Sequence, residues 1–184
     1  MLEYALVCPH PSKRSMCFLV LGAEDMSSSW IDLLNLPRPL KATAFTVDFD
    51  TDRYNAKAMS GDLHKELDET WERVLNEAKP GRILFNQSKF RLHSVEHESR
   101  GDQGSTTPVL NLGLTDYKSF ICTQQQILAP DLRQQITSEH LAHPLGVGCL
   151  LITSDQFAVL IRRSAACIDL PNMYDIPGGH AEPK

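Results

Sequence analysis

Two mostly apolar runs near the end of the chain have the pattern of paired strands. Residues 147–153 and 157–163 are rich in aliphatic side chains, and only the polar segment 154–156 separates them. Such runs around a short polar segment predict a β-hairpin. Another short strand is expected at 174–177. It leads into Gly178-Gly179, where the missing Cβ atoms permit a turn with positive φ and a close backbone approach to a ligand.

Upstream, the spacing of apolar residues predicts both helices and strands. Asp62 can cap a helix that carries apolar residues every three or four positions and ends near Lys79-Pro80-Gly81. Thr115 can cap a second helix, and a third is expected at 131–141. Strands are expected at 43–49, 89–97 and 109–114, with a turn at 50–52. This order predicts an α+β lobe that ends near residue 141.

Composition narrows the class of protein. The chain has 184 residues, of which 42% are hydrophobic, enough for one medium domain or a small domain and part of another. A net charge of -5 gives no general attraction to nucleic acid or to an anionic membrane. The five cysteines lack C-x-x-C spacing, which favours reduced thiols. The apolar run at 16–21 is too short for a signal peptide or a membrane span and predicts a buried strand. We therefore expect a cytoplasmic protein, with the nucleus as a second location.

The last ten residues carry the clearest chemical signal. They read Asp175-Ile176-Pro177-Gly178-Gly179-His180-Ala181-Glu182-Pro183-Lys184. An isolated Pro-Gly-Gly sequence is usually only a tight turn. Here it follows a predicted hairpin that ends in Arg162-Arg163-Ser164, and His-x-Glu-Pro comes directly after it. In that setting the segment resembles the opening of a Nudix box, G-x5-E-x7-R-E-U-x-E-E-x-G-U, in which U is a bulky aliphatic residue.

The Nudix box does not continue within these residues. If Gly179 is its first residue, the next required glutamate would come directly after Lys184. The R-E-U-x-E-E helix, which holds the catalytic magnesium in the family, is then absent from the 184 residues. We therefore expect that this sequence is a fragment or a shortened form of a longer protein.

Further segments resemble the branch of the Nudix family that hydrolyses UDP-glucose. These segments are 89–94, 112–117, 144–148, 155–164 and 174–183. The resemblance implies an α/β (α+β) fold, a Nudix-type α/β/α sandwich with a mixed sheet that is incomplete at its C-terminus. It also implies two parts, an N-terminal α+β lobe at 1–141 and the start of the Nudix domain at 142–184.

The resemblance implies magnesium-dependent hydrolysis of UDP-glucose, or a related UDP-sugar, to UMP and glucose 1-phosphate. Water would attack one phosphorus atom, while Mg²⁺ neutralises the developing charge and lowers the pKa of the attacking water. The glutamates that supply this chemistry are not in the sequence, so no catalytic residue is assigned. The backbone carbonyl of Gly178 is the one candidate metal ligand.

The resemblance also implies a set of substrate-binding residues. Phe85 and Tyr117 could stack on uracil, although core packing is the ordinary role of an aromatic side chain. Arg163 could bind the diphosphate through its guanidinium fork, whereas strand alternation places Arg162 on the opposite face. Ile168 would offer backbone contacts, at a position where relatives have smaller, alanine-like residues.

Three more residues complete this set. Asp175 could accept hydrogen bonds from sugar hydroxyls or from the uracil N–H group, and His180 could donate one to phosphate. Glu182 could accept hydrogen bonds from hydroxyl groups or orient a metal-bound water. Without the resemblance, all three would be ordinary turn or loop residues.

Three hypotheses remain open from the sequence. The first is a UDP-sugar diphosphatase of which these residues form the recognition part. The second is a catalytically inactive truncated isoform or fragment, which at most binds UDP-sugars or a protein partner. The third keeps the Nudix chemistry but changes the substrate to ADP-ribose or another dinucleotide. A missing Nudix helix would also leave Leu150, Ile152, Val159 and Ile161 of the hairpin partly exposed.

Overall fold

The computed structural model describes residues 15–18, 45–78, 84–100, 105–124, 134–168 and 170–184. Within them the elements are β1 (Ser15–Phe18), β2 (Thr46–Phe49), α1 (Thr51–Tyr54), α2 (Gly61–Asn76), β3 (Ser88–Arg100), β4 (Ser105–Asp116), α3 (Tyr117–Gln124), the 3-10 helix η3 (Ser138–His140), β5 (Gly146–Ile152), β6 (Ala158–Val159), β7 (Ile161–Arg162), β8 (Tyr174–Asp175) and β9 (Gly178–His180). This mixture of strands and helices confirms the predicted α/β (α+β) class. No described helix is both long and apolar enough to cross a membrane.

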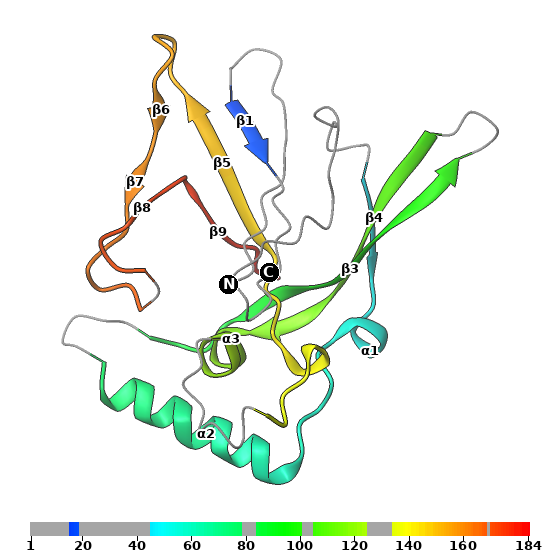
Figure 1. Ribbon diagram of the computed structural model, residues 1–184, viewed down its shortest axis with the longest axis vertical. Helices are drawn as coiled ribbons and strands as arrows, with labels where there is room; N and C mark the ends of the chain where they lie inside the picture. The colour runs from blue at the N-terminus through cyan, green and yellow to red at the C-terminus, as the bar shows by residue number, and fades with distance from the viewer. Residues whose placement is uncertain (1–14, 19–44, 79–83, 101–104, 125–133, 169) are drawn as a thin grey trace.

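The described strands β2, β4 and β3 form one sheet, with β4 in the middle. β4 runs parallel to β2 and antiparallel to β3, and the long β3–β4 hairpin points away from β6, β7 and β8 (Figure 1). A register shift between Leu92 and Ser94 marks an irregularity in β3. Leu92, Leu110 and Leu112 from this sheet pack with Leu145 in a buried apolar cluster.

Helices α2 and α3 pack against each other and form a second buried cluster. Leu67 and Trp71 of α2 contact residues of α3, of which Ile121 is completely buried. The apolar spacing that predicted α2 is confirmed, but the cap position is Ser60 and Asp62 lies in the first turn. At the start of α3, the Oδ1 atom of Asp116 accepts the Ser119 N–H at 2.7 Å, so Asp116 takes the role expected of Thr115.

A second sheet contains β1, β5 and β6, and β9 also pairs with β5. The two sheets are joined by backbone hydrogen bonds near the end of the chain. The Phe90 N–H donates to the Ala181 carbonyl at 3.0 Å, and the Ala181 N–H donates to the Leu145 carbonyl at 3.0 Å. The residues after β9 therefore lie beside the first residues of β3. The proposed division at 141/142 stays a prediction.

The expected hairpin forms only in part. Leu151 pairs with Val159, and the turn is closed by the Thr153 N–H, which donates to the Phe157 carbonyl at 2.8 Å. Beyond Val159 the second arm leaves β5, and β7 pairs with β8 instead. The reason is that β9 pairs with residues 146–148 of β5, the part of the strand that a longer hairpin arm would need.

Several other local expectations were wrong. The expected turn at 50–52 is the start of α1, because the Oδ1 atom of Asp50 caps it by accepting the N–H groups of Asp52 and Arg53. The helix expected at 131–141 is reduced, within its described part, to η3. Gly178 and Gly179 belong to extended strand β9 rather than to a turn with positive φ.

A strand was expected at 16–21, and β1 confirms it, while residues 19–21 lie outside the described part.

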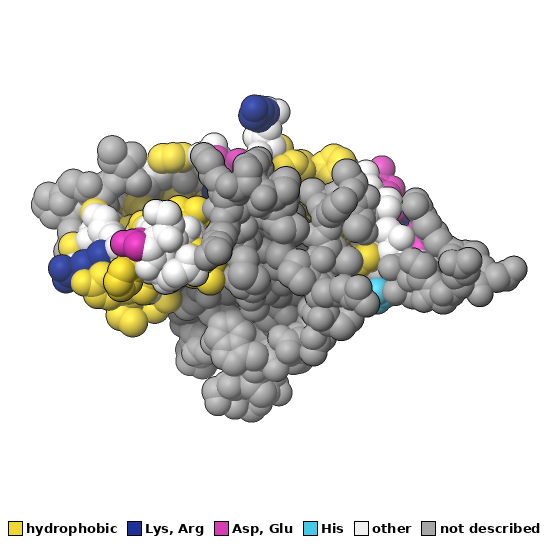
Figure 2. All heavy atoms as spheres, turned by 90° about the horizontal axis from the view of Figure 1, so that it is seen from above, with side chains coloured by type: hydrophobic (Ala, Val, Ile, Leu, Met, Phe, Trp, Pro, Cys, Tyr) yellow, Lys and Arg dark blue, Asp and Glu magenta, His cyan; other side chains and the backbone are white. Residues whose placement is uncertain are grey.

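Apolar side chains gather at the end of the molecule formed by β6, β7 and β8 (Figure 2). Leu160 is 53% exposed, and Val159 and Ile161 of the hairpin are also exposed. Leu150 and Ile152 are half-buried. The expected partial exposure of these four hairpin residues is confirmed.

Candidate functional site

A cavity of about 400 Å³ lies where the start of β3, the start of α3, the loop after β7 and the end of the chain meet. It is lined by Leu84, Phe85, Gln87, Lys89, Tyr117, Arg163, Ser164, Ala166, Cys167, Ile168 and Glu182. Five of the residues expected to bind substrate are among them: Phe85, Tyr117, Arg163, Ile168 and Glu182. The fold thus brings together residues that are almost one hundred positions apart in the sequence.

Tyr117 reaches the cavity because it is the first residue of α3. Its N–H group donates to the Gln87 carbonyl at 3.1 Å, which ties the start of α3 to the residues before β3. Its ring meets the Trp71 ring edge-on at 6.2 Å, and it packs against the α2–α3 cluster. Tyr117 therefore contributes to core packing and also lines the cavity. Phe85, by contrast, is 59% exposed and leaves its ring open to a ligand.

Glu182 is held by the side chain of Lys89, near the start of β3, and by that of Gln87, just before the strand. The Lys89 ammonium group lies 2.5 Å from Glu182 Oε1, and Gln87 Nε2 donates to Oε2 at 2.6 Å. The Lys89 ammonium also lies 5.7 Å from the centre of the Tyr117 ring. Neither Gln87 nor Lys89 was expected at the site. No local sequence signal marked Lys89, because alternation places it on the strand face opposite to Phe90 and Leu92.

Arg163 follows directly after β7. Its backbone N–H donates to the Met173 carbonyl at 2.9 Å, and its guanidinium Nη1 lies 3.2 Å from Asp175 Oδ2. Asp175 is not among the residues that line the cavity, but it orients one that does. Arg162 is exposed and bonds Asn172 instead, so the predicted opposite orientation of the two arginines is confirmed.

The remaining candidate residues differ in whether they line the cavity. Ile168 lines it and also packs against the α2–α3 cluster. The His180 ring meets the Phe120 ring edge-on at 5.1 Å and does not line the cavity. Burial, and then the positive charges of Lys89 and Arg163, lower the pKa of His180 to about 4. His180 is therefore a neutral imidazole near pH 7.

Position 178 requires a glycine because the backbone of a neighbouring strand lies very close to it. A Cβ atom at this position would lie 2.4 Å from the Val147 carbonyl oxygen, whereas one on Gly179 would meet nothing within 4 Å. Among the residues that the structure describes, no group of three or more His, Cys, Asp or Glu side chains could hold a metal ion. The described residues therefore do not by themselves form the ligand set of a magnesium site.

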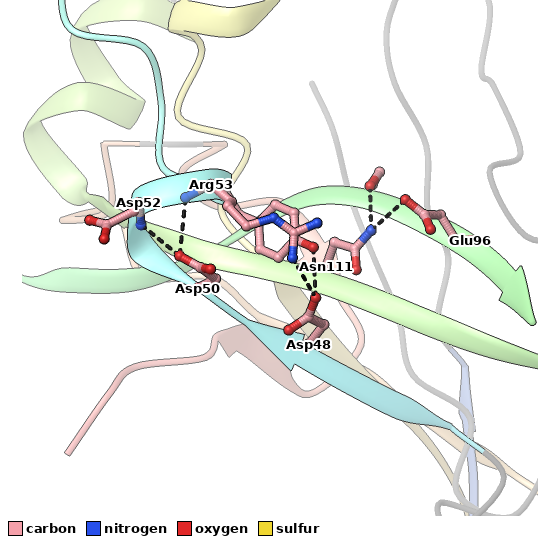
Figure 3. Close-up of polar contacts among 8 residues, drawn as sticks. Asp48, Asp50, Asp52, Arg53, Glu96 and Asn111 are labelled. Atoms are coloured by element: carbon pink, nitrogen blue, oxygen red, sulfur yellow. Dashed lines mark hydrogen bonds and ion pairs between the residues drawn. The ribbon is translucent and has the colours of Figure 1, made fainter.

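A second polar cluster lies over β2, α1, β3 and β4, outside the cavity lining (Figure 3). The Tyr54 hydroxyl donates to Asp48 Oδ2 at 2.7 Å, and Asn111 Nδ2 donates to Glu96 Oε1 at 2.8 Å. The Arg53 guanidinium also lies 3.4 Å from the Asp48 carboxylate. These side chains satisfy one another and tie α1 to the sheet, so we assign the cluster a structural role.

Comparison with known proteins gives the class of this chain. No protein-family model matches it. It is 31% identical over 173 residues to Nudix hydrolase 9 of Arabidopsis thaliana, an alignment that covers 88% of this chain and 54% of the plant protein. The chain is therefore a relative of the Nudix hydrolases.

A particular branch of that family also matches. The chain is 43% identical over 120 residues to the uridine diphosphate glucose pyrophosphatase NUDT22 of Homo sapiens, which covers 62% of this chain and 38% of the human protein. The Mus musculus protein of the same name is 39% identical over 126 residues, covering 65% of this chain and 39% of the mouse protein. The resemblance to the UDP-glucose branch is confirmed. The chain spans roughly two fifths to half the length of these relatives.

Proposed function

We propose that this chain carries the nucleotide-sugar recognition site of a UDP-sugar diphosphatase, which converts UDP-glucose to UMP and glucose 1-phosphate. The observation that carries this proposal is the lining of the cavity, which includes the rings of Phe85 and Tyr117 and the Arg163 side chain. A volume of about 400 Å³ lies within the usual range for small-molecule sites. The names of the mammalian relatives support UDP-glucose as the ligand.

The aromatic residues suit the uracil base. A pyrimidine ring stacks favourably on an aromatic face, and Phe85 is exposed enough to accept one. The Tyr117 ring is fixed by Trp71 and by the backbone hydrogen bond to Gln87. We assign uracil to this side of the cavity.

The charged residues of the lining suit the diphosphate and the sugar. The Arg163 guanidinium can bind a diphosphate through two parallel hydrogen bonds, and Asp175 holds it in place. The backbone at Ile168 is a further contact in this proposal, whereas His180, which lies outside the lining, is assigned none. Glu182 would accept hydrogen bonds from sugar hydroxyls.

The reaction adds water across the diphosphate. The water oxygen bonds to one phosphorus atom, the P–O bond to the bridging oxygen breaks, and the water protons leave on the products or to solvent. Magnesium, when bound, would neutralise the charge that develops on the phosphate oxygens. The Gly178 carbonyl is its one proposed ligand here, and the residues of this chain carry out binding and orientation.

Calorimetric titration of the 184-residue chain with UDP-glucose tests the binding proposal. The Arg163→Ala variant should bind at least about tenfold more weakly, because a charge-assisted hydrogen bond is lost. Arg162→Ala is the matched control, since it removes the neighbouring guanidinium from outside the cavity. Equal effects of the two substitutions, or tighter binding of ADP-ribose than of UDP-glucose, would contradict the proposal.

Turnover is measured separately from binding. Wild-type protein is incubated with UDP-glucose and Mg²⁺, and ³¹P NMR follows the appearance of UMP and glucose 1-phosphate. Formation of both products supports a diphosphatase. Binding without either product would support instead the inactive, UDP-sugar-binding alternative for this chain.

A further inference from the structure

Residues 87–90, at and just before the start of β3, connect two parts of the cavity lining. Gln87 accepts the Tyr117 N–H through its backbone carbonyl and binds Glu182 through its side chain. Lys89 lies over the Tyr117 ring and binds the other oxygen of the same carboxylate. The adjacent Phe90 N–H donates to the Ala181 carbonyl at 3.0 Å. The four-residue stretch 87–90 thus contacts both an aromatic ring and a carboxylate.

The Lys89–Glu182 pair differs from the ion pairs on the surface of this protein. The Lys89 side chain is only 8% exposed, whereas the Lys65 and Glu69 side chains of α2 are 77% and 60% exposed. A buried ammonium group is costly unless an anion and further partners stabilise it. The Glu182 side chain is 39% exposed, so its carboxylate still reaches the cavity. One partner is therefore anchored in the protein and the other is presented to a ligand.

We propose that Lys89 is a positioning residue, which together with Gln87 fixes the Glu182 carboxylate so that it accepts hydrogen bonds from the sugar hydroxyls of the nucleotide sugar. The inference rests on the proposed function for its ligand. Holding both carboxylate oxygens removes side-chain freedom before the ligand arrives, which lowers the entropic cost of binding. Lys89 acts through Glu182 and not through the phosphates.

Comparison of UDP-glucose with UDP as ligands tests this inference, because UDP lacks the sugar. In calorimetric titrations, Lys89→Met should weaken UDP-glucose binding about tenfold and leave UDP binding within about twofold. Methionine keeps the length of the stem and removes the charge. Lys89→Arg keeps the charge and should restore most of the affinity for UDP-glucose.

A matched control accounts for general effects of losing a half-buried ion pair. Lys118 lies next to Tyr117, is 20% exposed and binds Asp68 at 2.7 Å outside the cavity lining. Lys118→Met should leave the affinities for both ligands unchanged. The double variant Lys89→Met with Glu182→Gln should bind UDP-glucose no more weakly than Glu182→Gln alone, because the two residues act as a unit.

The outcomes separate this inference from the proposed function. An equal loss of UDP and UDP-glucose affinity in Lys89→Met, or additive losses in the double variant, would overturn the positioning role. Absence of binding of both ligands to the wild-type chain would overturn the proposed function. NMR of the Lys89 ammonium protons tests the pair without ligand: protection from solvent exchange that is lost in Glu182→Gln supports it, and no protection in the wild-type chain overturns it.

Discussion

The two walls of the cavity differ in what holds them in place. The wall formed by β3 and α3 rests on two buried apolar clusters, which include Leu92 and Ile121. On the wall that carries Arg163, the guanidinium pairs with Asp175 and the backbone N–H donates to the Met173 carbonyl, while the apolar residues just before it in sequence are exposed. The first wall is therefore positioned mainly by the apolar core, whereas the Arg163 side chain on the second is oriented by polar contacts. Substitutions in the first should change stability, and substitutions in the second should change binding.

The largest effect is expected from truncating the same residue type in the two regions. Leu92 is 2% exposed, so Leu92→Ala should lower the free energy of unfolding by about 3 kcal/mol through lost burial and the cavity that remains. Leu160 is 53% exposed, and Leu160→Ala should cost less than about 0.5 kcal/mol. Urea unfolding of both variants measures the difference. Similar losses in the two would show that the end formed by β6, β7 and β8 is packed as tightly as the core.

A smaller effect is expected from two adjacent glycines in β9. Gly178→Ala forces a Cβ atom against the Val147 carbonyl and should cost about 2 kcal/mol of unfolding free energy. Gly179→Ala meets nothing and should be nearly neutral. Because β9 leads directly to Glu182, we also expect weaker UDP-glucose binding in the first variant only. Calorimetry and urea unfolding test both points, and equal behaviour of the two variants would refute the close-approach explanation.

The smallest predicted effect concerns how the stability of the wall formed by β3 and α3 depends on pH. Burial, and then the positive charge of Arg91, lower the pKa of His143 from 6.5 to about 4, while the Ser138 carbonyl opposes the shift and His93 adds to it. The folded state thus favours the neutral imidazole. This preference for the neutral form contributes fully to the stability of the fold above pH 6.5, and the contribution is lost as the pH falls towards 4.

Replacement of His143 isolates this contribution. His143 has a positive φ of 38°, which asparagine tolerates well, so His143→Asn removes the titration without added backbone strain. Between pH 6.5 and 4, the wild-type chain should lose on the order of 1 kcal/mol more stability than this variant. Urea unfolding across the pH range measures it. An identical decline in both proteins would mean that other groups, such as His180, account for the acid sensitivity.

Local patterns predicted the elements whose partners are close in sequence. The spacing of Leu63, Leu67 and Trp71 gave α2, and alternation placed Arg162 and Arg163 on opposite faces. The hairpin at β5 and β6 was also recognisable, but its length was not. The pairing of β5 with β9 ends the hairpin, and that long-range competition leaves no mark in the local pattern.

The site was only partly predictable for the same reason. Phe85, Tyr117 and Arg163 could be assigned because the resemblance supplied them, and the structure places all three around one cavity. Lys89 was overlooked because a lysine in a strand is usually a surface residue. Its role depends on Glu182, 93 positions away, which only the folded chain brings to 2.5 Å. Asp175 was expected to accept hydrogen bonds from the ligand, and its pairing with Arg163 likewise became visible only in the folded chain.

A crystal structure of the 184-residue chain with UDP-glucose is the most direct test of the central claim. The account predicts uracil against Phe85 and Tyr117, the diphosphate on Arg163, and the glucose hydroxyls within hydrogen-bond distance of Glu182. A nucleotide sugar bound elsewhere on the molecule, with the cavity unchanged and without ligand, would contradict it.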